Sequence, residues 1–150
     1  MTNYIGSVVS VSPGVPATFD DAGYEALTWT VVGGLISAPI PGMETDTIDV
    51  PDLTTGITKR EKGASAGRET EMAFRDVPGN TGQANIRTYA APAYGSEVSV
   101  RVVLPNGTLT HIYMTGIMYS LMDNEGTVES FRGFVVTFSQ NYEEVRAAAP

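Results

Sequence analysis

The chain has 150 residues, which is the length of one domain and enough to bury a real core. It contains no cysteine, so disulfides, a thiolate nucleophile and cysteine-based metal sites are excluded. No stretch approaches the ~20 apolar residues of a membrane span, so no membrane partner is expected.

The net charge of −8 is unevenly distributed along the chain. Residues 1–58 carry seven acids and no Lys or Arg (−7), residues 59–75 five bases and three acids (+2), and residues 76–150 seven acids and four bases (−3). A basic patch on an acidic body is suited to recognition between two copies of one chain, and a solvated charged loop is the alternative. Nucleic-acid binding in the usual sense is disfavoured because it requires clustered Lys and Arg.

The first half of the chain is predicted to hold short strands around one long loop. Residues 22–26 allow one helical turn, and residues 27–32, 47–50 and 72–76 have the composition of strands. Residues 54–69 are polar and glycine-hinged, and a segment of this length without its own secondary structure is usually functional or disordered. This segment is therefore predicted to be a loop that is disordered before assembly and orders on contact.

One longer helix is predicted over residues 80–91. Asn80 or Thr81 can cap its start, and Pro92 ends it. Apolar residues three and four positions apart give it a single face that can dock on a sheet. These residues are Ile86, Tyr89 and Ala90.

Residues 97–104 (EVSVRVVL) form the clearest predicted strand. Apolar residues alternate strictly with residues that are mostly polar or charged. This alternation is typical of a sheet with one apolar and one polar face. The apolar set is Val98, Val100, Val102 and Leu104, and the second set is Glu97, Ser99, Arg101 and Val103. Residues 105–107 (PNG) favour a hairpin turn into the next strand.

Two further long strands are predicted, over residues 110–122 and 128–139, and together these strands indicate an antiparallel sheet. Neither face of the strand over residues 110–122 is clearly polar enough to be solvent-exposed. Both faces are therefore expected to be covered, by the domain core or by a neighbouring subunit. Gly116 in the middle of this strand favours a bulge or a bend. Residues 147–150 are predicted to be a frayed tail.

No catalytic or cofactor site is predicted. His111 is the only histidine and has no acid near it in sequence, so a structural or interface role outweighs that of a general base. The glycines of GASAG (residues 63–67) lack the lysine and the strand–loop–helix context of a phosphate cradle. Asp46, Asp49 and Asp52 invite a calcium interpretation, but carboxylates three apart on an extended segment point to alternate faces.

The order of motifs along the chain resembles a known family. "PATFDDAGYEALT" is followed by a short apolar strand, a Pro/Gly elbow, "IDVPDL", the basic "TKREKGASAGRE" segment and then "PGNTGQANIRTYAA". This order is similar to that of the major tail tube protein of long, non-contractile (siphovirus-type) bacteriophage tails, over nearly the whole chain. The resemblance implies a single tail tube domain over residues 1–150. Its fold is expected to be an antiparallel β-sandwich or half-open barrel with one flanking helix and a long assembly loop.

The resemblance also implies a structural role in the virion, without enzymatic activity or cofactor. Six copies are expected to close into a ring whose edges pair between subunits, and rings stack into a tube that delivers DNA. Implied partners are further copies of the chain and the tail tip, terminator and tape-measure proteins of the same tail, with assembly in the host bacterial cytoplasm and non-specific passage of DNA. The same fold serves contractile tails and type VI secretion tubes, so the fold alone does not separate them.

Two groups of residues are expected to serve such a tube. Inter-ring or inter-subunit contacts are assigned to Lys59, Arg60, Lys62 and Arg68. The channel-facing candidates are Glu97, Ser99 and Glu129, with Glu44 and Asp46 more peripheral. Arg101 shares the predicted face of Glu97, and a salt bridge to a neighbouring acid would reconcile it with an acidic wall.

A different class of function is a monomeric adhesion or carbohydrate-binding β-sandwich that decorates a virion or a cell surface. Such a domain is expected to expose aromatic residues on loops, whereas most Tyr and Phe residues here fall within predicted strands. A small enzyme is a third class and lacks a catalytic constellation.

Overall fold

The computed structural model describes residues 5–105, 110–124 and 132–147. This part of the chain contains ten strands and two short helices. In chain order they are β1 (Val8–Ser12), α1 (Asp21–Glu25), β2 (Thr30–Val32), β3 (Leu35–Ser37), β4 (Met43–Pro51), β5 (Thr58–Gly67), β6 (Glu69–Arg75), α2 (Thr81–Tyr89), β7 (Val98–Val103), β8 (His111–Asp123), β9 (Gly133–Gln140) and β10 (Val145–Ala147).

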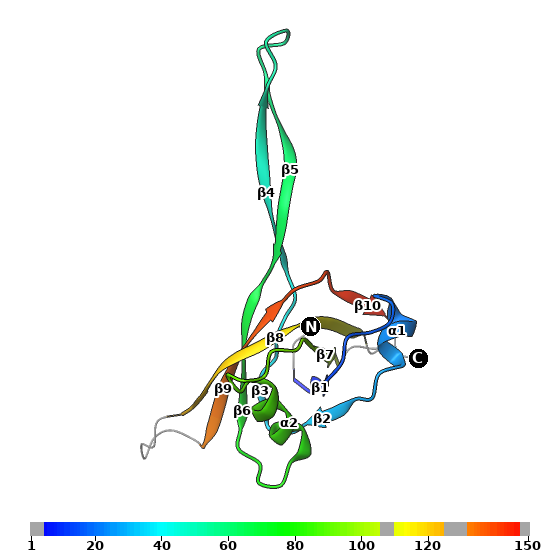
Figure 1. Cartoon of the computed structure of the whole chain (residues 1–150), viewed down its shortest axis with the longest axis vertical. Coiled ribbons are helices and arrows are strands. Elements are labelled where there is room, and N and C mark those ends of the chain that lie inside the picture. The colour runs from blue at the N-terminus through cyan, green and yellow to red at the C-terminus, as the bar shows by residue number, and fades with distance from the viewer. Residues whose placement is uncertain (1–4, 106–109, 125–131, 148–150) are drawn as a thin grey trace.

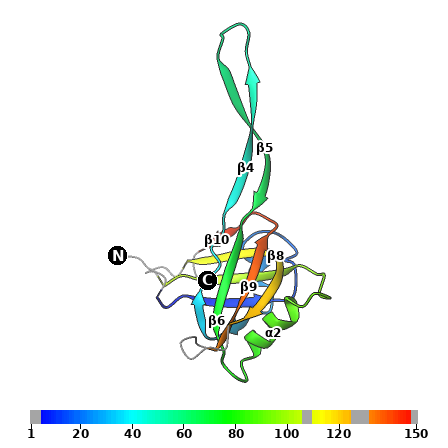
Figure 2. The ribbon, with the colours of Figure 1, turned by 90° about the vertical axis from the view of Figure 1, so that its left-hand side faces the viewer.

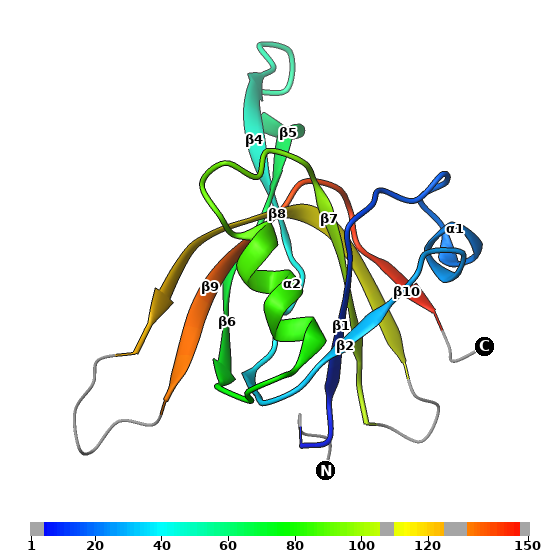
Figure 3. The ribbon, with the colours of Figure 1, turned by 60° about the horizontal axis from the view of Figure 1, so that its bottom comes forward.

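Eight strands form one antiparallel sheet that curves around α2 (Figure 3). The strand order is β2-β1-β7-β8-β9-β6-β3, with β10 paired to β8 beyond the end of β9. The sheet is not closed, although its two end strands, β2 and β3, follow each other in sequence. This arrangement confirms the predicted mostly-β, half-open architecture with a flanking helix.

The core lies between α2 and the inner face of the sheet. Alternate residues of β7 point into it, as the period-two pattern predicts, and Ile86 and Tyr89 of α2 pack against them. The other inner positions of the sheet contribute Val9, Val11, Met72, Phe74, Ile112, Met114, Met118, Phe134, Val136 and Phe138. Asn80 caps α2 by accepting a hydrogen bond from the Gln83 amide, so the helix begins and ends close to its predicted bounds.

Part of the outer face is covered by the segment that contains α1. Tyr24 of α1 stacks on Tyr113 with a ring-centroid distance of 5.0 Å, and its hydroxyl lies 2.8 Å from Thr115 Oγ1. Ser99 Oγ donates to the Gly14 carbonyl at 2.6 Å. The first half of β8 is therefore buried on both faces by its own chain, which answers the question that its sequence left open.

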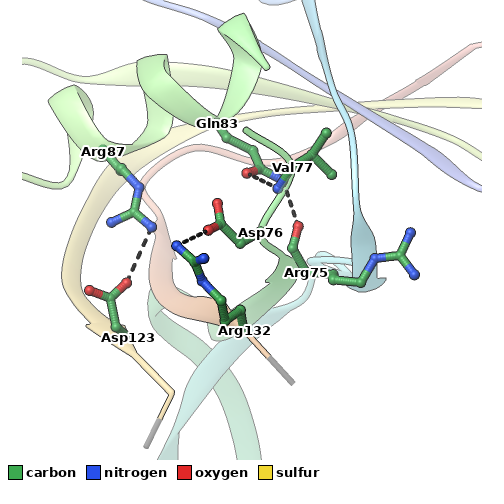
Figure 4. Close-up of polar contacts among 7 residues, drawn as sticks. All are labelled: Arg75, Asp76, Val77, Gln83, Arg87, Asp123 and Arg132. Carbon is green, nitrogen blue, oxygen red and sulfur yellow. Dashed lines mark hydrogen bonds and ion pairs between the residues drawn. The ribbon is translucent and has the colours of Figure 1, made fainter. Parts of the chain in front are cut away.

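The first turn of α2 holds the two ends of the sheet together, and Figure 4 shows its contacts with Arg75 and Val77. The Gln83 amide donates to the carbonyls of Gly33 (2.7 Å) and Arg75 (2.8 Å), and its oxygen accepts from the Val77 amide (3.1 Å). Gly33 joins β2 to β3, whereas Arg75 ends β6. One buried side chain thus satisfies three backbone groups at the seam, where the strand ladder does not close.

Of the two predictions for Gly116, the bulge is wrong, because the strand register does not shift at this residue. It pairs with both Val98 and Gln140, at the point where β8 changes its partners, and an added Cβ would lie 1.9 Å from the Ser139 carbonyl oxygen. The register shift comes later, between Tyr119 and Met122, where Ser120 has a φ of 53°. Glycine is needed at 116 because a neighbouring backbone approaches closely.

The predicted loop over residues 54–69 is also wrong. Residues 58–67 form β5, which pairs along its length with β4 in a hairpin that projects from the body, hereafter the arm (Figures 1 and 2). Its turn begins at Asp52, which accepts hydrogen bonds from Thr54 and Gly56 amides, and Gly56 has a φ of 69°. Glycine-rich, charged residues can form a strand here because the partner strand supplies the backbone hydrogen bonds.

The C-terminal predictions are only partly covered by the described residues. Ala147, assigned to a frayed tail, is the last residue of β10, whereas residues 148–150 lie outside the described part. The predicted turn at 105–107 and residues 128–131 of the predicted last strand also fall largely outside it.

Candidate assembly surfaces

The arm is exposed along nearly its whole length. Every residue of β4 is exposed, as are eight of the ten residues of β5. At the tip, Leu53 is fully exposed and Ile57 is 62% exposed. A two-stranded hairpin is marginally stable in water by itself, and exposed aliphatic side chains favour contact with another surface. The arm therefore has the properties of a contact element.

The register of the hairpin gives the arm two different faces. One face, the arm's Ile48 face, carries Ile48 and Val50 with the charged residues Glu44, Asp46, Lys59 and Glu61. The other, the arm's polar face, carries Thr45, Thr47, Asp49, Thr58, Arg60, Lys62 and Ser65. On the polar face Arg60 Nε lies 3.5 Å from Asp49 Oδ1, and the hydroxyls of Thr45 and Ser65 are 2.8 Å apart. Both groups of the Arg60–Asp49 pair are exposed, so it adds little to stability.

The arm continues the ladder of the main sheet. Only Arg68 separates β5 from β6. Its amide donates to the Gly42 carbonyl at 2.9 Å, and its carbonyl accepts from the Gln140 amide at 3.2 Å. The Gln140 side chain also accepts from the Gly42 amide at 3.1 Å, so the base of the arm is fixed to β9.

A second surface, made of exposed and half-buried residues, lies on the outer face of the sheet, on β6, β9 and the second half of β8. The pairing places Glu69, Ser139 and Ile117 in one row and Glu71, Thr137 and Tyr119 in the next. We call these two rows the open outer face. Burial, together with a hydrogen bond to the Glu69 carboxylate, raises the pKa of Tyr119.

A third surface, the aromatic patch, is built from Phe19, Tyr142 and Glu97. The Phe19 and Tyr142 rings have centroids 4.5 Å apart, and they are 44% and 36% exposed. The Tyr142 hydroxyl donates to Glu97 Oε1 at 3.0 Å, and Asn141 Nδ2 donates to Glu97 Oε2 at 3.4 Å. The hydrogen bond to Glu97, and then its charge, raises the pKa of Tyr142.

A small cleft beside α2 is lined by two ion pairs (Figure 4). Arg87 reaches Asp123 at 3.2 Å, and Arg132 reaches Asp76 at 3.2 Å. The Arg87 guanidinium also lies over the Phe134 ring, 4.5 Å from its centroid. Because each charge has a partner in the cleft, the cleft is not an open anion or cation site, and these largely exposed ion pairs add little to stability.

The four residues predicted for inter-subunit contact are all exposed, but they do not share one face. Lys59 is on the arm's Ile48 face, Arg60 and Lys62 are on its polar face, and Arg68 lies at its base. Their role in contact stays a prediction.

The assignment of Ser99 as a channel-facing residue is wrong, because Ser99 is completely buried under the α1 segment. Glu97 lies just before β7 and belongs to the aromatic patch. Glu129 lies outside the described residues. Glu44 and Asp46 are exposed on the arm.

Arg101 does not form the predicted salt bridge within the described part of the chain. Its guanidinium donates to Ser10 Oγ at 3.2 Å and lies 5.2 Å from the centre of the Trp29 ring. His111 is buried with Nδ1 3.2 Å from the Tyr113 hydroxyl. Burial and the charge of Arg101 lower the pKa of His111, whereas the charge of Glu25 opposes them.

The described residues contain neither a cluster of metal ligands nor a membrane-spanning helix. No group of three or more His, Asp or Glu side chains there could hold a metal ion. Asp46 and Asp49 lie on opposite faces of the arm, as the spacing argument predicts. In the same ranges no helix is long and apolar enough to span a membrane.

The sequence matches no protein-family model and no curated protein. Solved structures are similar over almost the whole chain. The tube-terminating cap of the anti-feeding prophage has a TM-score of 0.67 at 15% identity, covering 99% of this chain and 92% of its own. The SPP1 tail tube has a TM-score of 0.63 at 14% identity, covering 95% and 77%. The tail of an empty GTA particle, solved with C6 symmetry, has a TM-score of 0.63 at 12% identity and covers both chains completely. The chain therefore has the tail tube fold that these structures share.

Proposed function

We propose that this protein is the structural subunit of a phage-type tail tube. Six copies close into a ring, and rings stack into a hollow tube that forms part of the virion tail and carries DNA to the host cell. The observation that carries the proposal is the fold likeness to tail and tube structures over 95–100% of the chain. Copies of the chain assemble in the host cytoplasm with terminator, tip and tape-measure proteins as partners.

Two features of the described residues support self-assembly. The arm exposes both of its faces and an aliphatic tip. Apolar side chains that are exposed in this way are typical of a surface that contacts another protein. Among the described strands, β2 and β3 end the curved sheet, and each has one edge that pairs with no other strand. Pairing with a neighbouring subunit would satisfy the backbone groups of those edges. Sixfold closure is favoured by the C6 symmetry of the GTA tail.

The purified protein is expected to form rings and tubes as its concentration rises. Mass photometry across a concentration series measures the oligomer, and negative-stain images show whether rings stack. A protein that stays monomeric at high concentration and is missing from the tubes of phage lysates would contradict the proposal. That result would favour the adhesion domain instead.

We propose the open outer face as the wall of the channel in place of Glu97 and Ser99. It is mostly polar and contains no Lys or Arg, and its two carboxylates, Glu69 and Glu71, are exposed, one in each row. Carboxylates repel DNA phosphates within roughly 8 Å at physiological salt, so such a wall lets DNA pass without capture. The α1 segment covers the half of the outer face that holds Ser99, which removes that half from the wall.

Glu71→Lys is expected to give tubes that retain DNA. Glu71 is exposed, and each ring would gain a lysine from every subunit, so retention of labelled single-stranded DNA should rise roughly tenfold at low salt and fall as salt is added. Retention is measured by sedimenting tubes with fluorescent DNA. Glu71→Gln is the matched control and should lie between wild type and Glu71→Lys. Equal retention by all three proteins would show that position 71 does not face the channel.

A further inference from the structure

We propose that the basic residues Lys59, Arg60 and Lys62 on the arm of one copy dock on the aromatic patch of a second copy. The inference rests on the proposed function, since it names the surface that receives the arm within the tube. It names the residues on both sides of the contact, whereas the fold likeness identifies neither surface.

The basic side of the contact is the distal half of β5. It carries the only two lysines of the chain, Lys59 and Lys62, with Arg60 between them. The three side chains alternate between the two faces, but β5 pairs only with β4 in this region and leaves its other edge open. Long Lys and Arg side chains on both faces can reach around that edge and converge on one partner surface.

The receiving side combines exposed aromatic rings with carboxylates. Phe19 and Tyr142 present a closely packed pair of rings tilted by 30°, and the face of an aromatic ring attracts Lys and Arg cations. The Glu97 carboxylate is held beside Tyr142 by two hydrogen bonds. Asp20 follows Phe19 in sequence and Glu143 follows Tyr142, and both are exposed. Arg60 is already paired with Asp49, and Asp20 already caps α1. The contact therefore matches chiefly Lys59 and Lys62 with the rings and with the carboxylates of Glu97 and Glu143, which is complementary in charge and chemistry.

The partner must be a second copy because the arm cannot reach its own patch. The patch lies near the arm's base, since Tyr142 is two residues from Gln140, which binds Gly42 and Arg68 there. Lys62 and Lys59 are five and eight residues from the base end of β5, or about 17 and 27 Å along an extended strand. The arm points away from the body (Figure 1), so its basic residues extend toward a neighbour.

Cross-linking of assembled tubes tests the contact directly. A zero-length carbodiimide joins a lysine amine to a carboxylate with loss of water, and Lys59 and Lys62 are the only lysine donors. Tubes built from mixed ¹⁴N- and ¹⁵N-labelled subunits should give hybrid cross-links from these lysines to Glu97, Glu143 or Asp20. Hybrid cross-links that lead only to other acids would overturn the assignment.

A charge-reversal pair provides the second test. Lys59→Glu with Lys62→Glu should reduce tube yield at least ~tenfold through like-charge repulsion, as should Glu97→Lys with Glu143→Lys. Combining all four changes should restore assembly, whereas combining the arm reversal with Glu71→Lys should not. Thermal melts check that each variant folds.

The outcomes separate this inference from the proposed function. If wild-type protein forms no rings or tubes, both are wrong. If tubes form but either the expected cross-links or the rescue is missing, the docking assignment is wrong and the tube function stands.

Discussion

Removal of the distal arm is expected to abolish tube assembly while the body stays folded. Thr45 and Ser65 face each other in the hairpin, so residues 46–64 can be replaced by an Asn-Gly turn that closes a short hairpin. The removed residues lie outside the hydrophobic core, so the melting temperature should stay within about 2 °C of wild type. Assembly should fall below detection at concentrations where wild type is mostly tube.

Negative-stain counting and analytical ultracentrifugation measure this loss. The matched control is Glu61→Gln, which keeps the arm and removes one charge that is not part of the basic group. Normal tubes from the shortened protein would show that the arm does not drive assembly. An unfolded shortened protein would instead show that the arm stabilises the body, contrary to the separation seen in Figure 1.

Gln83→Met is expected to lower the stability of the folded protein strongly. The change keeps the side-chain length but deletes three hydrogen bonds to backbone groups of Gly33, Arg75 and Val77. Each buried group left unpaired costs about 1–3 kcal/mol, so the free energy of unfolding should fall by about 3–5 kcal/mol. The two ends of the sheet would lose their shared partner at the seam.

Urea unfolding, followed by the fluorescence of Trp29, measures this free energy. Thr88→Ala on the same helix is the control, because the Thr88 side chain is exposed and, among the described residues, donates only to the Ala84 carbonyl of its own helix. It should change stability by less than about 0.5 kcal/mol. A Gln83→Met protein as stable as the control would show that water or backbone rearrangement satisfies the seam.

Strands with one buried face could be predicted from sequence. In β7 each second residue meets the core, so burial imposes a period of two on residue type, and the pattern is visible without the structure. Helix α2 was predictable for a related reason, because capping and one apolar stripe are local signals.

The arm could not be predicted in this way. Both faces of β4 and β5 are exposed, so the sequence of β5 has no alternation between buried and exposed residue types. Its Lys, Gly and Ser residues have the composition of a loop. Pairing with β4, whose register is shifted by a bulge between Thr45 and Thr47, supplies the hydrogen bonds that make it a strand. Composition identified a basic segment suited to contact, and only the pairing shows which of its bases share a face.

The channel candidates show the same division between local and tertiary information. Alternation along residues 97–103 placed Ser99 opposite the core, which holds in the structure. It could not reveal that this half of the outer face is covered by a segment about 80 residues earlier, where Gly14 accepts from Ser99. Sequence by itself determined the strand periods, the capped helix, the absence of cysteine chemistry and the position of the basic segment. Tertiary structure alone decided which outer-face residues stay exposed and how the arm continues the sheet, because both depend on contacts between residues far apart in the chain.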